Sequence, residues 1–247
     1  MIGSPINLSH PAAHSGFSLV ELTIVLLIVA LLSGGLMLSL SSQQEQAQSK
    51  ELQHQWELQS EALLGFAMAN GRLPCPADPT VATTAGAGSE AITCNPVDCS
   101  GDRTCTLEHG VLPWLTLGIK ETDPWGNRFT YFVGREFANP LSATEINNGL
   151  RARFKLDTVG RANIQDGAGN NTVRDLPAVV VSHGNRAVGA YQSNGTQIAG
   201  AAGDEAENAD ADLTFISHTP NAGFDDFVGW VVPSVLKSRM VTVGKLP

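Results

Sequence analysis

An apolar run from Phe17 to Leu40 contains one charged residue, Glu21, and constrains this chain more than any other feature. A helix of about 24 residues is roughly 36 Å long, which is close to the thickness of a membrane's hydrocarbon core when the helix is tilted. A carboxylate in such a segment costs on the order of a few kcal/mol unless it is paired, so it usually marks a function. We therefore expect a transmembrane helix over residues 17–40 in which Glu21 has a specific role.

The charges of the chain are unevenly distributed. All 15 Lys and Arg residues and 23 of the 24 Asp and Glu residues lie after residue 40 of the 247, and the formal net charge is -9. This charge argues against nucleic acid as a partner, because surfaces that bind nucleic acid are basic. No nucleophile elbow, phosphate-binding loop, metalloprotease helix or dinucleotide motif occurs in the sequence. We therefore expect no catalytic residues and no enzyme.

Residues 16–23 read GFSLVELT. This segment resembles the prepilin cleavage and methylation motif of type IV pilins and type II secretion pseudopilins. The resemblance implies that residues 1–16 are a leader, that a prepilin peptidase cleaves after Gly16 and methylates the amine of Phe17, and that Glu21 pairs with that amine in a neighbouring subunit. The alternative is a single-pass anchor that carries a periplasmic binding or sensor module and does not polymerise.

Four further segments resemble minor pilins and pseudopilins less specifically: residues 73–76, 110–114, 123–127 and 225–230. The resemblance implies a structural subunit, a minor pilin or pseudopilin of a type IV pilus or type II secretion pseudopilus. Such a subunit is single-pass in the bacterial inner membrane, with its C-terminal head in the periplasm, before it enters the pilus or pseudopilus. Its implied partners are other pilin or pseudopilin subunits, the prepilin peptidase and an inner-membrane assembly platform.

Residues 41–71 are expected to continue the helix with an amphipathic pattern. Apolar residues recur there at helical spacing, at Leu52, Trp56, Leu63 and Ala67. Asn70-Gly71 is typical of a helix end, because glycine readily adopts the left-handed conformation that follows the last turn.

Residues 72–247 are expected to form the periplasmic head. The fold class is α+β, and the resemblance implies a pilin-like fold in which the long N-terminal helix, with a membrane half and an amphipathic half, packs on an antiparallel β-sheet with long loops. Runs rich in β-branched and aromatic residues indicate strands at residues 128–133, 151–159, 178–182, 187–192 and 213–217.

The four cysteines are expected to form two disulfides, because the implied periplasmic location is oxidising. Three connectivities are possible. We favour Cys75 with Cys105, which would tie the end of the helix to the strands, and Cys94 with Cys99 as a small closed turn. A zinc site formed by all four thiolates is the alternative, although the spacing lacks a close Cys-x-x-Cys pair.

A run of acidic residues near the C-terminus has no basic residue within it. Carboxylates so close together repel one another unless they are solvated or bind a cation, and oxygen ligands in a loop suit Ca²⁺. The major pseudopilin of the resembled family holds calcium in an acidic loop near its C-terminus, so Ca²⁺ is the one candidate cofactor and a solvated loop is the alternative. The candidate ligands are Asp204, Glu205, Glu207, Asp210 and Asp212.

Overall fold

The computed structural model describes residues 18–95 and 101–247, without the side chains of residues 32–42 and 102. The described chain is α+β, with seven helices and nine strands. The helices are α1 (Leu19–Asn70), the 3-10 helix η1 (Thr83–Ala85), α2 (Trp114–Leu117), α3 (Arg135–Ala138), α4 (Ala143–Asn147), α5 (Asp204–Glu207) and α6 (Pro233–Thr242). The strands are β1 (Ile92–Asn95), β2 (Asp102–Cys105), β3 (His109–Val111), β4 (Thr130–Val133), β5 (Ala162–Gln165), β6 (Asn171–Leu176), β7 (Ala178–Ser182), β8 (Thr214–Ile216) and β9 (Phe227–Trp230). The chain divides into two units at the boundary between Ala47 and Gln48.

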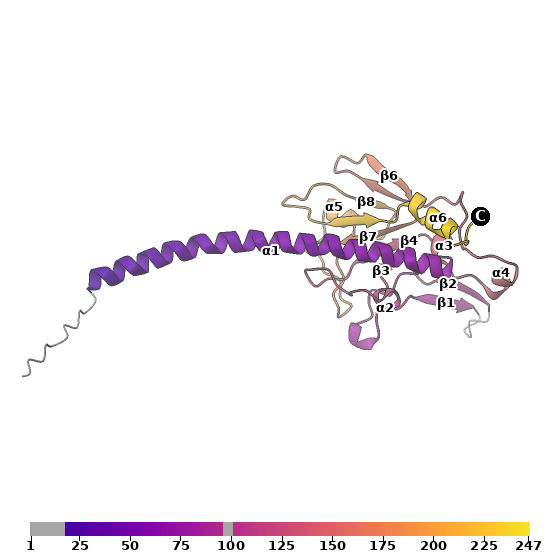
Figure 1. Cartoon of the computed structure of the whole chain (residues 1–247), viewed down its shortest axis with the longest axis horizontal. Helices are drawn as coiled ribbons and strands as arrows, with labels where there is room; N and C mark the ends of the chain where they lie inside the picture. Colours follow the sequence, from indigo (N-terminus) through magenta and orange to yellow (C-terminus); the bar gives the residue numbers. More distant parts are fainter. Residues whose placement is uncertain (1–17, 96–100) are drawn as a thin grey trace, which may run out of the picture. The chain divides into compact units, whose positions relative to one another are not determined.

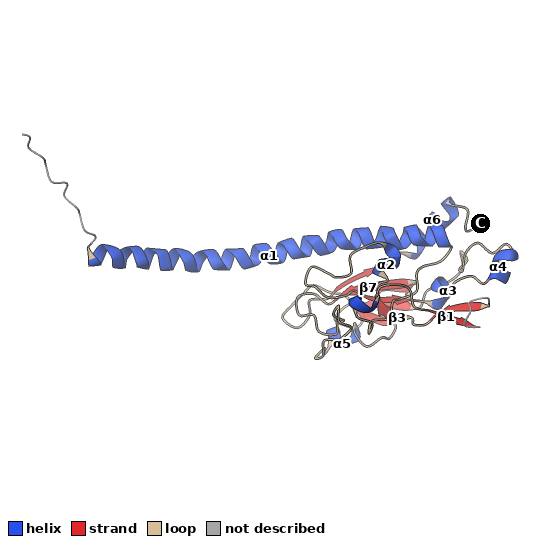
Figure 2. Cartoon of the chain, turned by 90° about the horizontal axis from the view of Figure 1, so that it is seen from below, coloured by secondary structure: helices blue, strands red, loops and turns tan. Residues whose placement is uncertain are grey.

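A four-stranded antiparallel sheet, in the order β3-β4-β7-β9, forms the centre of the second unit. Alternate side chains of a strand point to opposite faces, so the fully buried β7 contributes to two cores. Val180 belongs to the core that contains Leu63 of α1, whereas Val179 belongs to the core that contains Ile164 of β5. Figures 1 and 2 show the part of α1 after residue 48 running along one face of these strands.

Three strands in the order β6-β5-β8 cover the other face of the central sheet, and β5 pairs with β8 in parallel. A third sheet contains only β1 and β2, which pair in antiparallel register. The expected fold, in which one antiparallel sheet packs on a long apolar and then amphipathic helix, is therefore wrong. Three sheets form instead, because Phe132, Val179 and Val181 present a second apolar face that needs its own cover.

The expected membrane segment and its location are corrected as well. The apolar part of α1 whose side chains are described, residues 19–31, is short and exposed. Within the residues that the structure describes, no helix is both long and apolar enough to pass through a membrane. The expectation of a single-pass inner-membrane protein with a periplasmic head is therefore not upheld.

The amphipathic part of α1 is as expected from the sequence. Leu52, Leu63 and Ala67 are buried in the core beside the central sheet, and Trp56 packs against it. The helix ends at Asn70, and Gly71 follows with a φ of 76°. A Cβ atom at Gly71 would lie 2.2 Å from the Arg151 carbonyl oxygen, so glycine is required there for space as well as for conformation.

Three of the five expected strands occur, as β4, β7 and β8, with β4 and β8 shorter than expected. Residues 151–159 form no strand, because the Arg153 amide donates to the Gly71 carbonyl at 2.8 Å and so pairs with the end of α1. Residues 187–192 form no continuous strand, because Ala187 has a φ of 58° and the Ala190 amide turns back to donate to its carbonyl at 3.1 Å. Tyr191 alone forms isolated β-bridges, with Arg128 and Gln197.

Candidate functional site

The first turns of α1 expose apolar side chains around one carboxylate. Leu19, Leu27 and Leu31 are among the most exposed of these residues, and Glu21 is exposed between them. The Ser18 hydroxyl accepts a weak hydrogen bond from the Val20 amide at 3.4 Å. Glu21 lies in the first turn, where a negative charge is favourable to the helix dipole. Gly16 and Phe17, the expected processing residues, lie outside the described residues.

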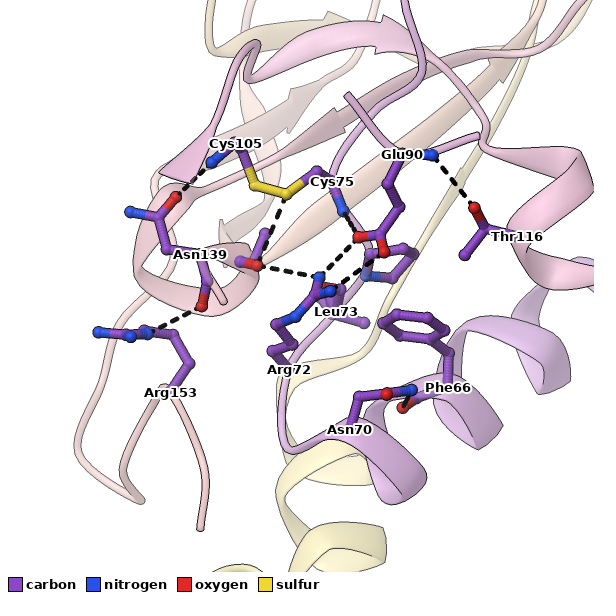
Figure 3. A network of polar contacts seen from close by, with 12 residues as sticks. Phe66, Asn70, Arg72, Leu73, Cys75, Glu90, Cys105, Thr116, Asn139 and Arg153 are labelled. Atoms are coloured by element: carbon purple, nitrogen blue, oxygen red, sulfur yellow. Dashed lines mark hydrogen bonds and ion pairs between the residues drawn. A yellow bond between two sulfur atoms is a disulfide. The ribbon is translucent and has the colours of Figure 1, made fainter. Parts of the chain in front are cut away.

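A disulfide joins Cys75 and Cys105, the pair that the sequence favours, across a sequence separation of 30 residues. Both cysteines are buried. The Cys105 amide donates to the Asn139 side-chain oxygen at 2.9 Å, and the Cys75 amide donates to Glu90 Oε1 at 2.6 Å (Figure 3). These two sulfur atoms are bonded to each other, so a zinc site that uses all four thiolates does not form.

Cys94, which the sequence predicts in the second disulfide, is also disulfide-bonded. It lies in β1, which pairs with the strand that ends at Cys105. Cys99 lies outside the described residues.

An ion pair beside the disulfide connects the end of α1 to the head. Arg72 Nη1 and Nη2 donate to the two oxygens of Glu90 at 2.6 and 3.0 Å, and both side chains are largely buried. Arg72 also donates to the carbonyls of Leu73 and Ala138, and its guanidinium lies 5.1 Å from the Phe66 ring centroid (Figure 3). Because the charged groups of this network are satisfied within the chain, it has a structural role.

The five carboxylates expected to form one calcium site lie in three different places. Asp204 is the first residue of α5, and its Oδ2 lies 2.9 Å from His218 Nε2. Glu207 is near Asp210 and Asp212 in a second group at the surface. In that group, Asp210 Oδ1 accepts from the Asp212 amide at 3.2 Å, which is turn geometry.

Glu205, the fifth of these carboxylates, points into a third place, beside Asp225 and Asp226. Each of these three residues offers an oxygen within 4.8 Å of the other two. Burial raises the pKa of the Glu205 carboxyl above its ordinary value, Asp226 and Asp225 raise it further, and Arg186 opposes the shift. Asp225 and Asp226 were not expected here, because nearly twenty residues separate them from α5 in the sequence.

Two further groups near α5, Glu207 and His218, have pKa values raised by their surroundings. Burial, followed by Asp212, Asp210 and Asp204, raises the pKa of the Glu207 carboxyl. A hydrogen bond to the Thr219 backbone and then Asp204 raise the pKa of His218. The Asp204 carboxylate is therefore engaged with a histidine and does not join either of the two carboxylate groups.

Ser182 and His183 do not act as nucleophile and base. The Ser182 hydroxyl donates to Asp123 Oδ2 at 2.7 Å, whereas His183 Nε2 lies 2.8 Å from the Thr130 hydroxyl. Ser182 and His183 are fully buried, so no substrate could reach them in this conformation. Their hydrogen bonds satisfy buried polar groups in the interior of the head.

No family model, curated protein or solved structure matches this chain. Two features of the described residues bear on its function. One is the exposed apolar first part of α1 with its lone Glu21, and the other is the buried carboxylate group around Glu205.

Proposed function

We propose that this chain is a structural subunit of a type IV pilus or type II secretion pseudopilus. It is cleaved after Gly16 and methylated at Phe17, and it assembles with other pilin or pseudopilin subunits through the first part of α1. A prepilin peptidase and an inner-membrane assembly platform are its other partners. The observation that supports the proposal best is the exposed apolar surface of residues 19–31.

This surface is stabilised when another apolar surface covers it. The exposed fraction of the large apolar residues over this stretch ranges from 47% at Val25 to 81% at Leu19. Fully burying one such side chain stabilises an assembled state by about 1.5–3 kcal/mol. Exposed apolar surface of this extent marks an interaction site, and the same segment of further subunits offers a matching surface.

Glu21 sets how neighbouring subunits align. It is the only formally charged side chain in the first forty residues, so no side chain nearby in the sequence can neutralise it. Cleavage after Gly16 would create an α-amine on Phe17, four residues earlier. When helices pack in parallel, an ion pair between that amine and a neighbour's carboxylate is satisfied at one axial offset only.

Processing is tested by mass. The full chain is co-expressed with a prepilin peptidase, and the intact mass of the purified product is measured. We expect a chain that begins at methylated Phe17. A product that still begins at Met1 in the presence of active peptidase would contradict the proposal.

Assembly is tested by substitution on α1. Glu21→Ala should leave cleavage intact but lower the amount of chain recovered in sheared filaments or in cross-linked subunit ladders. An ion pair worth about 1.4 kcal/mol corresponds to a loss of about tenfold. Glu57→Ala is the matched control, because Glu57 is an exposed glutamate of the same helix. Equal recovery of the two variants would refute the role of Glu21.

A further inference from the structure

A cleft lies between α1 and the segment that follows α2. Its volume is about 700 Å³, and it is lined on one side by residues of α1 between Glu51 and Ala62 and on the other by residues 117–120. The stretch of α1 that lines it is roughly 16 Å long, at 1.5 Å per residue. The cleft therefore has the shape for an elongated ligand.

Two buried glutamines of α1, Gln55 and Gln59, line this cleft. Gln55 is 6% exposed and Gln59 is 2% exposed. The side-chain carbonyl oxygen of each accepts no hydrogen bond from any residue that the structure describes. A buried acceptor without a donor costs more than a hydrogen bond contributes, so a ligand that donates to these oxygens would stabilise the fold.

The charged neighbours of Gln55 are already paired with each other. Gln55 Nε2 donates to Glu51 Oε1 at 3.0 Å, and the same oxygen accepts from Lys120 Nζ at 2.7 Å. These bonds use the nitrogen of the Gln55 amide and leave its carbonyl oxygen. The charges of Glu51 and Lys120 compensate each other, so the cleft suits an uncharged donor better than an ion.

The walls of the cleft are apolar on both sides. Leu58 of α1 is 54% exposed, and Leu117 and Ile119 are only partly buried against the core. The Ile119 wall is fixed, because the Ile119 amide donates to the Trp114 carbonyl at 3.0 Å. A ligand with apolar side chains on both flanks would cover these residues.

The spacing of the two glutamines matches an extended polypeptide. Gln55 and Gln59 are one turn apart, which is about 6 Å along the helix. Backbone amides on the same edge of an extended chain recur every second residue, roughly 6.5–7 Å apart. The torsion of a terminal side-chain amide is broad, so a rotation can turn each carbonyl towards such an edge. Five extended residues span about 17 Å, which is close to the length of the cleft.

We propose that this cleft binds an extended apolar segment of another polypeptide, whose alternate backbone amides donate to the side-chain carbonyls of Gln55 and Gln59. The side chains of that segment pack on Leu58 on one flank and on Leu117 and Ile119 on the other. The site does not depend on the proposed filament function and would exist in a chain that never polymerises.

Binding is tested by fluorescence anisotropy with the purified full chain. The probe is a capped Val-Ala-Val-Ala-Val peptide joined to fluorescein through a Gly-Ser-Gly spacer. Two further probes carry N-methyl groups, one on the amides of residues 1, 3 and 5 of the peptide and the other on those of residues 2 and 4. N-methylation removes donors from one edge of the extended chain only. We expect one of the two methylated peptides to bind about tenfold or more weakly and the other to bind like the unmethylated probe.

Gln59→Leu removes one acceptor and keeps the approximate size of the side chain. It should raise the melting temperature, because a buried carbonyl without a donor is lost, and it should weaken binding of the unmethylated probe by about fivefold or more. Gln53→Leu is the matched control, because Gln53 is an exposed glutamine of the same helix. The control should leave binding unchanged. Circular dichroism of each variant reports whether it is folded.

The proposal is overturned if the native chain does not bind the unmethylated probe. It is also overturned if the two methylated peptides bind equally, which is the result expected from non-specific adsorption on the exposed apolar residues 19–31. Equal binding by folded Gln59→Leu and native chains would overturn it as well. Sedimentation of the chain alone tests a second copy as the occupant, and oligomers that Gln59→Leu dissociates would contradict the proposal.

Discussion

The indole ring of Trp56 on α1 lies directly over Gly229 on β9, where a Cβ atom would approach ring atoms to within 2.7 Å. This contact is where α1 meets the edge strand of the central sheet. We expect Gly229→Ala to lower the free energy of unfolding by about 1–3 kcal/mol, because overpacking displaces the ring or the strand. Urea unfolding of the two chains measures the difference.

Gly65 provides the control for that substitution. It is an exposed glycine within the same helix, and a Cβ atom there would meet no other atom within 4 Å. Gly65→Ala should raise the free energy of unfolding by about 0.5–1 kcal/mol, since alanine loses less backbone entropy in a helix. If both substitutions change the free energy of unfolding in the same direction, the contact with Trp56 does not limit the size of residue 229.

Removing the disulfide should destabilise the head. The Cys75–Cys105 bond closes a loop with a sequence separation of 30, which corresponds to about 3–4 kcal/mol in the chain-entropy account. We expect the Cys75→Ala/Cys105→Ala double variant to lose this amount in urea unfolding. Because both sulfurs are buried, reductant should act on the native chain only as slowly as the chain opens. Rapid reduction without unfolding would contradict this expectation.

The Arg72–Glu90 ion pair should contribute more to the free energy of unfolding than an exposed pair does. Glu90→Ala leaves a largely buried guanidinium without its partner, so we expect a loss of about 3–5 kcal/mol in the free energy of unfolding. Glu51→Ala, which breaks the exposed pair with Lys120, should have no measurable effect. Comparable losses in the two variants would show that burial does not set the strength of these pairs.

Asp123 should make stability depend on pH. Burial raises the pKa of its carboxyl, although hydrogen bonds from Asn127, Ser182 and Trp125 oppose the shift. A carboxyl with a raised pKa binds its proton more tightly in the folded chain. Its contribution to stability is therefore complete below its unfolded pKa and is lost as the pH rises through the folded pKa.

Asp123→Asn removes that titration. Urea unfolding gives the free energy of unfolding of the native chain and of the variant at each pH. The native value minus the variant value should fall as the pH rises from about 4 and should then become level. Glu145→Gln should give the opposite slope, since a hydrogen bond from Arg153 lowers the pKa of Glu145 and the associated stability is lost as the pH falls. Matching slopes would mean that burial does not control the titration of Asp123.

The sequence predicts elements whose pattern is local. The buried face of α1, its end at Asn70 and the strand Ala178–Ser182 follow from spacing and residue type, and all three occur. Residues 151–159 have a strand-like composition, with Ala152 and Phe154 buried in alternation. They form no strand because the Arg153 amide bonds to the residue after α1, and sequence cannot indicate that partner.

The group formed by Glu205, Asp225 and Asp226 is likewise not predictable from the sequence, because it depends on contacts between distant segments. A run of acidic residues is visible in the sequence, but the fold sends Asp204 to His218 and turns Glu205 towards Asp225. Pairing of β8 with β5 and of β9 with β7 creates that meeting point, and those pairings join segments far apart in the chain. The aspartates before β9 could have been found only by knowing which strands are neighbours.

The parallel pairing of β5 with β8 also sets the order in which the head can fold. The two strands are separated by about fifty residues, and β9 joins the central sheet later still in the chain. Pairings between such distant segments carry a large loop-closure cost and form slowly. Both cores must therefore remain incomplete until the residues after 213 have been synthesised, and the last cooperative step of folding waits for these residues.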